Sequence, residues 1–282
     1  MEVLKNKKTL QDFIERQKEM GKRIGFAPTM GALHKGHLSL YEAARADNDL
    51  VISSIFVNPT QFNNPEDLEK YPRDINRDIL ILENSGLVDA VYIPEVVDIY
   101  PEKAESQHYD FDGLENEMEG KSRPGHFDGV GTVVEELFRQ VKPDNAYFGE
   151  KDFQQLAIIK KMVEKKKLPI KIIGVPIYRA ESGLALSSRN QRLHEDRRDA
   201  SKVIYKTLKK VNELFKINPV SEIKEKVQDV FDNQKGMQLE YFLIADEETL
   251  KETDFFYKGK NYRAFIVVIV DGVRLIDNMH LD

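Results

Sequence analysis

The residues best suited to chemistry form one short segment, residues 29–37, with the sequence TMGALHKGH. The apolar residues 23–28 before it predict a buried strand, and a helix is predicted to begin near Gly36. Ligands bind at the carboxyl ends of parallel strands, and a helix N-terminus offers free N–H groups with a partial positive charge. His34 and His37, three residues apart on the first turn, can both face such a ligand. As hydrogen-bond donors they would stabilise the charge that grows on a phosphoryl group during its transfer.

The histidine pair is also compatible with other roles. Two histidines in such a turn are also compatible with surface residues or with a fragment of a metal site, although no third zinc ligand lies nearby in the sequence. The chain contains no GxxxxGK[ST] motif, and Gly31 and Gly36 do not match the dinucleotide-binding pattern GxGxxG. A P-loop ATPase and a nicotinamide-dependent enzyme are therefore disfavoured, whereas a surface pair stays open.

Asn58 and Gln61 lie in a second segment, residues 56–62 (FVNPTQF), at the end of the next predicted strand. Their neutral amides can both donate and accept hydrogen bonds beside the first βα turn. A polar turn that contains a proline explains the same residues without any ligand, so both interpretations stay open for this segment alone.

Lys151 and Asp152 lie in a third segment, residues 148–155 (FGEKDFQQ), between a predicted strand and a predicted helix. A lysine there attracts phosphate, and a carboxylate at a helix start is favoured by the helix dipole. Helix capping alone also explains Asp152. For Gln154 we favour plain solvent exposure.

A fourth segment, residues 186–190 (LSSRN), contains Ser187, Ser188 and Arg189. Two hydroxyl groups and a guanidinium can surround a triphosphate. Because Ser-Ser-Arg is common in loops, this segment carries weight only together with the other three.

Composition limits the class of protein. The chain has 282 residues, of which 41% are hydrophobic and 32% charged, which suits two domains with a real core. Its formal net charge of −6 argues against general nucleic-acid binding. The absence of cysteine excludes disulfides and thiolate nucleophiles. The longest apolar run, residues 264–270, is far shorter than the roughly 20 residues of a membrane span. We therefore expect a cytoplasmic protein without a membrane or nucleic-acid partner.

The order of predicted elements indicates an α/β fold. Strands and helices alternate up to residue 175, which predicts a parallel sheet with helices on both sides. Two long helices and then adjacent strands follow, which predicts a smaller α+β domain with an antiparallel sheet. We thus expect a Rossmann-like domain over residues 1–176 and an α+β domain over residues 177–282. The predicted helices are 9–20 (with Thr9 as N-cap), 36 onward, 74–85, 127–141, 151–166, 195–216 and 221–233, and the predicted strands are 23–28, 50–57, 88–93, 145–148, 170–175, 238–245, 264–270 and 273–279.

Five segments in this order resemble the pantothenate synthetase family: PTMGALHKGH, FVNPTQF, RPGHFDGV, GEKDFQQL and GLALSSRN. The first is also similar to the HxGH motif of the nucleotidyltransferase superfamily. The resemblance covers the whole chain and implies a ligase that joins pantoate to β-alanine through a pantoyl-adenylate. ATP would be the co-substrate, Mg²⁺ its metal, and the enzyme would be a homodimer of the pantothenate biosynthesis pathway.

The resemblance also implies a set of site residues. His37 is the family's proton donor, although the charge on a five-coordinate phosphorus favours an electrostatic role. The catalytic set is His37, His34, Lys151 and Arg189. The substrate-binding set for pantoate is Gln61, Gln155 and Asn58, with Gln61 also near β-alanine. The ATP-binding set is Met30, Gly31, Ala32, Leu33, His34, Lys35, Gly36, His37, Gly149, Glu150, Lys151, Asp152, Tyr178, Leu186, Ser187, Ser188 and Arg189.

Individual roles follow from the same resemblance. Lys151 would contact the phosphates, Asp152 the ribose or adenosine end, and the backbone of Tyr178 the adenine. The LSSRN loop would close over the triphosphate from the second domain, which thereby acts as a lid.

Other residues of the matching segments have no assigned chemistry. Arg123 and His126 of RPGHFDGV match the family, and ordering a loop over the site is the simpler interpretation of both. The protein ligands of Mg²⁺ are unknown, with Asp74 and Asp78 as possible helpers. Two other functions are considered: a sibling nucleotidyltransferase with a phosphorylated acceptor, and an inactive nucleotide-binding module.

Overall fold

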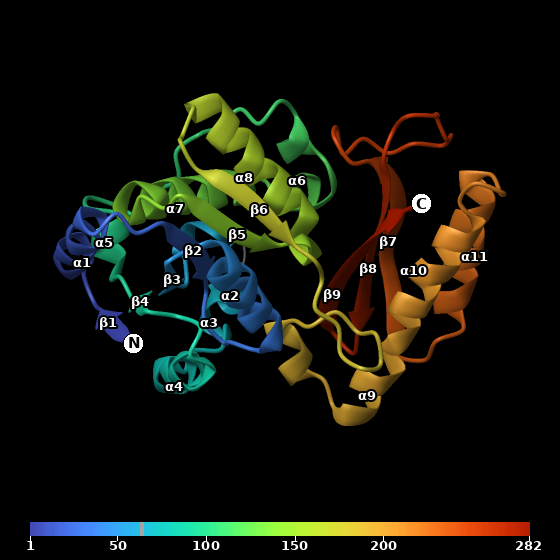
Figure 1. The fold of residues 1–282 in the computed structure, drawn as a ribbon. Coiled ribbons are helices and arrows are strands. Elements are labelled where there is room, and N and C mark those ends of the chain that lie inside the picture. The colour runs from blue at the N-terminus through green and yellow to red at the C-terminus, as the bar shows by residue number, and fades with distance from the viewer. Residues whose placement is uncertain (63–64) are drawn as a thin grey trace. The chain divides into compact units, whose positions relative to one another are not determined.

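The computed structural model describes residues 1–62 and 65–282, and it divides into two compact units (Figure 1). The first unit comprises Met1–Glu150 and Gln154–Pro176, and the second comprises Lys151–Phe153 and Ile177–Asp282. The division after residue 176 resembles the predicted ranges, but residues 151–153 group with the second unit instead of the first.

The first unit contains a parallel sheet of six strands in the order β1-β4-β3-β2-β5-β6, as predicted for a Rossmann-like domain. Its chain runs outward from β2 in one direction through β3 and in the other through β5. The switch between the two directions therefore lies beside β2, where open α/β sheets bind their ligands. The strands are β1 (Glu2–Leu4), β2 (Ile24–Thr29), β3 (Leu50–Ile55), β4 (Ala90–Tyr92), β5 (Asn145–Gly149) and β6 (Lys171–Val175).

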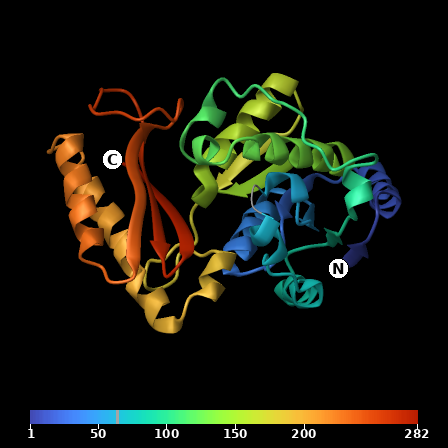
Figure 2. The ribbon, with the colours of Figure 1, turned by 180° about the vertical axis from the view of Figure 1, so that it is seen from behind.

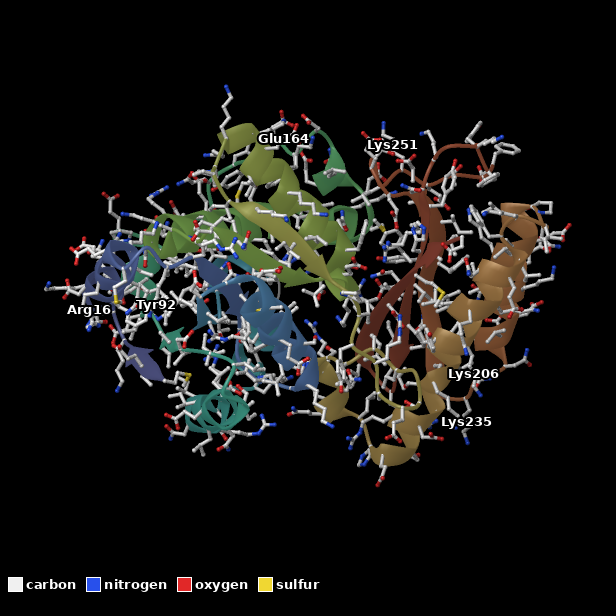
Figure 3. The ribbon with its side chains drawn as sticks, in the orientation of Figure 1. Arg16, Tyr92, Glu164, Lys206, Lys235 and Lys251 are labelled. Atoms are coloured by element: carbon white, nitrogen blue, oxygen red, sulfur yellow. The ribbon has the colours of Figure 1, made fainter. Side chains whose placement is uncertain are left out.

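Helices cover both faces of this sheet, as the two opposite views show (Figures 1 and 2). Neighbouring residues of a strand point to opposite faces. On β2, Ala27 packs in one core cluster with Leu40 of helix α2 (Lys35–Asp47). Phe26 meets Phe138 of helix α7 (His126–Val141) edge to face at 6.4 Å. In Figure 3, Tyr92 of β4 lies inside the unit, while charged side chains extend from its surface.

Each helix predicted for this unit is present to within a few residues, with one difference in capping. The short helices Pro65–Glu69, Val96–Ile99 and Met118–Ser122 and strand β1 lie outside the predicted elements. Helix α1 begins at Lys7, with Asn6 as N-cap, because Asn6 accepts the N–H of Thr9 and Thr9 accepts the N–H of Asn6. Thr9 is thus the third residue of a capping box and not the N-cap. The helices are α1 (Lys7–Glu19), α2 (Lys35–Asp47), α3 (Pro65–Glu69), α4 (Ile75–Ser85), α5 (Val96–Ile99), α6 (Met118–Ser122), α7 (His126–Val141) and α8 (Phe153–Lys166), with 3₁₀ helices η1 (Pro59–Gln61), η2 (Leu114–Asn116) and η3 (Glu150–Asp152).

The second unit is a three-stranded antiparallel sheet with two long helices packed on it, as predicted for an α+β domain. The single helix predicted over residues 195–216 is two helices. The interruption lies at Ser201, whose hydroxyl donates to the carbonyl of Arg197 at 2.7 Å, a contact that often bends helices. The elements are η4 (Ser188–Arg192), α9 (Glu195–Ala200), α10 (Lys202–Leu214), α11 (Val220–Asp232), β7 (Met237–Asp246), β8 (Tyr262–Val270) and β9 (Val273–Leu281). No helix among the described residues of either unit is long and apolar enough to cross a membrane.

Helix α7 packs unusually closely against η1 in the first unit. A Cβ atom added to Gly129 would lie 2.6 Å from the carbonyl oxygen of Thr60 and 2.9 Å from the backbone nitrogen of Gln61. Only glycine permits this approach of two backbones, and it brings the first turns of α7 onto the loop after β3.

We predict that Gly129→Ala destabilises the protein by about 1–3 kcal/mol, the usual range for added volume in a packed site. Alanine in place of glycine inside a helix otherwise stabilises by about 1 kcal/mol, so the two effects have opposite signs. Urea unfolding at neutral pH measures the difference. An increase in the free energy of unfolding would show that the contact relaxes without strain.

Candidate functional site at the carboxyl edge of the parallel sheet

The HKGH turn between β2 and α2 is organised by its own histidines. His34 is the N-cap of α2, so the helix begins at Lys35, one residue before the predicted start. The Nδ1 atom of His34 accepts the backbone N–H of Gly36 at 3.1 Å, and Nδ1 of His37 accepts the N–H of His34 at 3.2 Å. The two rings lie 4.1 Å apart between centroids. The pair therefore forms a capping box built from imidazoles.

These two hydrogen bonds determine what the rings can offer a ligand. A nitrogen that accepts a hydrogen bond carries no proton, so each neutral ring must carry its proton on Nε2. Both histidines thus have Nε2–H as their donor while Nδ1 holds the backbone. Two neutral N–H donors at the start of a helix suit the binding of an anion there.

A buried carboxylate holds the loop that precedes these histidines. Asp78 of α4 is 1% exposed, and its two oxygens accept the backbone N–H groups of Ala32 and Leu33, each at 2.8 Å. Ala32 has a φ of +50° and Gly31 a φ of +81°, so two successive residues adopt left-handed backbone. Such a conformation is costly for alanine and persists only where the surroundings impose it. Asp78 imposes it here.

The same hydrogen bonds change our expectation for the metal. Both oxygens of Asp78 are engaged by backbone amides, and Asp74 caps α4 by accepting the N–H of Arg77 at 3.0 Å. The two carboxylates therefore have structural roles, and the expectation that they help to hold Mg²⁺ finds no support. Among residues 1–62 and 65–282, no group of three or more acidic, histidine or cysteine side chains could hold a metal ion.

Gln61 lies beside the HKGH loop at the end of η1. Its Nε2 donates to the sulfur of Met30 at 3.0 Å, and its Oε1 accepts from Nδ2 of Asn58 at 3.2 Å. The amide is 9% exposed, and it retains one N–H and one lone pair that no described residue engages. A ligand hydroxyl, which both donates and accepts, would match that pair of positions.

Asn58 supports Gln61 and lies deeper, at 1% exposure. Besides Gln61, its Nδ2 reaches the carbonyl of Gly129 at 3.1 Å, and its Oδ1 accepts from the hydroxyl of Tyr100 at 2.6 Å. The burial of this phenol raises the pKa of Tyr100, which keeps its proton available for Asn58. Asn58 is thus buried and holds the side-chain amide of Gln61.

The FGEKDFQQ segment follows β5, the other neighbour of β2 in the sheet. Our expectation that Gln154 is exposed to solvent is wrong: it is 5% exposed. Its Nε2 donates to the carbonyls of Leu114 and Glu117, both at 2.8 Å, and its Oε1 accepts the N–H of Glu119 at 3.0 Å. A long polar side chain can be buried when every polar atom is paired, and sequence pattern does not reveal such pairing.

Gln155, the next residue, is half-buried, and no described residue hydrogen-bonds its side chain.

Lys151 groups with the second unit, and a buried asparagine of that unit holds its backbone. Nδ2 of Asn278, on β9, donates to the carbonyl of Lys151 at 2.9 Å, and Arg263 donates to Oδ1 of Asn278 at 2.6 Å. The Lys151 ammonium lies 3.6 Å from Asp152 Oδ1, and Asp152 itself is exposed. Nothing in the sequence singled out Asn278, because its role depends on a contact across 127 residues.

The LSSRN loop of the second unit is held at both ends. The N–H of Leu186 donates to the carbonyl of Tyr178 at 3.0 Å, and Nδ2 of Asn190 donates to the carbonyl of Ala185 at 3.2 Å. Ser187 caps η4 by accepting the N–H of Arg189 at 3.3 Å. The predicted loop is therefore an ordered turn whose serines lie at the start of a 3₁₀ helix.

Comparison with known proteins identifies the family. The model of the family described as pantoate-beta-alanine ligase matches residues 2–280. The chain belongs to this family. It is 52% identical to a pantothenate synthetase of Christiangramia forsetii over the full length of both chains.

Solved structures show the same likeness. The crystal structure of a pantothenate synthetase from Thermus thermophilus matches with a TM-score of 0.89 at 38% identity, over 99% of each chain. A pantoate-beta-alanine ligase from Francisella tularensis, complexed with beta-gamma ATP and beta-alanine, matches with a TM-score of 0.79 at 37% identity, over 99% of this chain and 97% of that one. The α/β class, with a parallel sheet and a smaller antiparallel sheet, which the order of predicted elements indicated, is thus confirmed.

We predict that the stability of wild type falls relative to Asp78→Asn as the pH rises. Burial raises the pKa of the Asp78 carboxyl above its ordinary value of 3.8, and this outweighs the opposing effects of Leu33, Ala32 and Arg77. A raised folded-state pKa means that the folded protein binds the proton more tightly, so stability is lost between pH 3.8 and that raised value.

Urea unfolding of both proteins across that pH range measures the effect. Glu83→Gln removes an exposed carboxylate from the same helix and should show no such dependence. A wild type that gains stability over Asp78→Asn with rising pH would mean that the two amides more than compensate for burial.

Proposed function

We propose that this chain joins pantoate to β-alanine with ATP, through a pantoyl-adenylate, and releases AMP and pyrophosphate. The observation that carries the proposal is the HKGH turn at the switch point of the sheet, where Asp78 and two capping bonds orient two neutral imidazoles. Membership of the pantoate-beta-alanine ligase family and the complex of the Francisella relative with beta-gamma ATP and beta-alanine support it.

In the first half-reaction, the pantoate carboxylate would attack the α-phosphorus of ATP. Residues 30–37 would line the ATP site, with the Nε2–H groups of His34 and His37 donating to phosphate oxygens. Gln61 and Gln155 would hold pantoate by its hydroxyl and carboxylate groups. The free donor and acceptor of Gln61 suit a hydroxyl.

In the second half-reaction, the amine of β-alanine would attack the acyl carbon of the adenylate, and AMP would leave. Lys151 and Arg189 would stabilise phosphate charge, and Gly149, Glu150 and Asp152 would complete the nucleotide site with residues 186–188. Because the described residues contain no metal cluster, Mg²⁺ would be carried on the ATP phosphates and water, as is common for this ion. The backbone contact of Tyr178 with adenine, the lid role of residues 177–282 and the homodimer stay predictions from the family. The cytoplasmic location stays a prediction from composition.

We predict that pantoate, ATP and Mg²⁺ suffice for the first half-reaction. Without β-alanine, mass spectrometry should detect a bound adenylate, and positional isotope exchange should occur in labelled ATP. Adding β-alanine should release pantothenate and AMP in equal amounts.

Two results would contradict this scheme. If neither the adenylate nor isotope exchange is found without β-alanine, a two-step reaction through pantoyl-adenylate is excluded. AMP transfer to a phosphorylated acceptor in place of pantoate would favour a sibling nucleotidyltransferase, and no turnover with any acceptor would favour an inactive nucleotide-binding module.

We predict that His37→Ala slows adenylate formation by roughly 10²–10³-fold, the usual loss for one preorganised donor at developing charge. This is about 3–4 kcal/mol of transition-state stabilisation. The rate of attack by β-alanine on supplied pantoyl-adenylate should fall less, because pyrophosphate and its charge have already left the site. Single-turnover assays of each half-reaction measure the two losses.

Because His37 also caps α2, alanine should cost about 1 kcal/mol of stability as well. His37→Gln provides the control, since glutamine at this position of a capping box can accept the same N–H. It should recover the melting temperature without recovering the adenylation rate. Recovery of both together would assign His37 a purely structural role.

A further inference from the structure

The RPGH segment lies at the junction of α6 and α7 in the first unit, and the proposed chemistry gives it no role. Gly125 has a φ of +77°, and this left-handed residue turns the chain so that α7 begins at His126. Both Arg123 and His126 then point back to η1. His126 is 7% exposed, so its ring is a buried polar group that needs partners.

Both side chains meet at a single atom, the backbone carbonyl oxygen of Gln61. Nδ1 of His126 lies 2.8 Å from this oxygen, and Nη2 of Arg123 lies 3.1 Å from it. A carbonyl oxygen has two lone pairs, so both donors can be satisfied at once. The carbonyl of Gln61 is therefore held by two side chains from a segment more than 60 residues away.

The contact also determines the state of the histidine. Because a carbonyl only accepts, Nδ1 of His126 must carry a proton. In the neutral ring Nε2 is then an acceptor, and Nη1 of Arg123 lies 3.4 Å from it. The guanidinium thus spans the carbonyl and the ring, and the two residues act on Gln61 as one unit.

The remaining contacts of Gln61 show what the hydrogen bonds from Arg123 and His126 achieve. Asn58 and Met30 engage its side-chain amide, and Gly129 brings α7 against its backbone nitrogen. Backbone and side chain are therefore both held before any ligand arrives. One N–H and one lone pair of the amide stay without a partner among the described residues.

We propose that Arg123 and His126 are positioning residues that hold Gln61 in the orientation in which its amide recognises the hydroxyl and carboxylate groups of pantoate. This inference rests on the proposed function, because it takes Gln61 as the pantoate contact. Misplacement of a positioning group by about 1 Å costs up to roughly 10²-fold in rate. If Gln61 is no longer held in place, we expect the KM for pantoate to rise while the KM for ATP stays nearly unchanged.

The test compares variants at both positions in steady-state assays with each substrate varied in turn. His126→Phe keeps a ring and removes the Nδ1–H donor. His126→Asn restores a donor, because Nδ2 of asparagine is bonded to Cγ as Nδ1 of histidine is. Arg123→Met keeps the length of the stem, Arg123→Lys keeps the charge, and Arg139→Met, on the exposed side of α7, is the matched control.

We expect the KM for pantoate to rise roughly 10-fold or more in His126→Phe and Arg123→Met, with the KM for ATP within about twofold of wild type. His126→Asn should recover most of the loss, Arg123→Lys should recover part of it, and Arg139→Met should resemble wild type. Melting temperatures are recorded for each variant, because a variant that only lost folded protein would show lower kcat and unchanged KM values.

Three outcomes would overturn the inference. Equal rises in all KM values, or a loss confined to kcat, would indicate a general structural role. A rise in the KM for β-alanine alone in Arg123→Met would mean that Arg123 contacts the carboxylate of that substrate directly. Failure of the proposed function is distinct, since wild type itself would then form no AMP from ATP and pantoate.

Discussion

The candidate site depends on one interaction, the pair of hydrogen bonds from Ala32 and Leu33 to the buried carboxylate of Asp78. Without it, an alanine would not remain in left-handed backbone beside a left-handed glycine. The residue after this loop is His34, whose position as N-cap sets where α2 begins and where both imidazoles lie. Burial raises the pKa of Asp78, so keeping this carboxylate ionised in the loop costs stability.

The same principle recurs around Gln61. A buried asparagine, a methionine sulfur and the RPGH segment hold its side chain and its carbonyl, and a glycine on α7 lets the helix come close enough. In both loops buried side chains take part in holding the groups expected to meet substrate: Asp78 in one loop, and Asn58 and His126 in the other. Such preorganisation limits the reorganisation that would otherwise accompany the reaction.

The second unit uses a polar network for a similar purpose. Arg179 and Asp277 form a bidentate pair at 2.7 and 2.9 Å, and Asp277 is 5% exposed. Arg179 also donates to the carbonyl of Gly183 at 3.1 Å, shortly before the LSSRN segment in the chain. Burial raises the pKa of Asp277, and the arginine opposes that shift. The neighbouring Asn278 holds the carbonyl of Lys151, so adjacent residues of β9 hold the guanidinium of Arg179 and the backbone of Lys151.

The sequence by itself determined the α/β class, the order of most elements and the segments of the site, because these follow from local periodicity, from βα turn chemistry and from motifs that are contiguous in the chain. The tertiary structure decided the rest. It showed that Gln154 is buried, that the carboxylate of Asp78 holds the loop before His34, and that Arg123 and His126 meet at Gln61. Each of these depends on a hydrogen bond between residues at least 35 positions apart. A carboxylate, an amide or an imidazole looks the same in a sequence whether its partner is solvent, a ligand or a distant backbone group, and only the folded chain brings that partner into place.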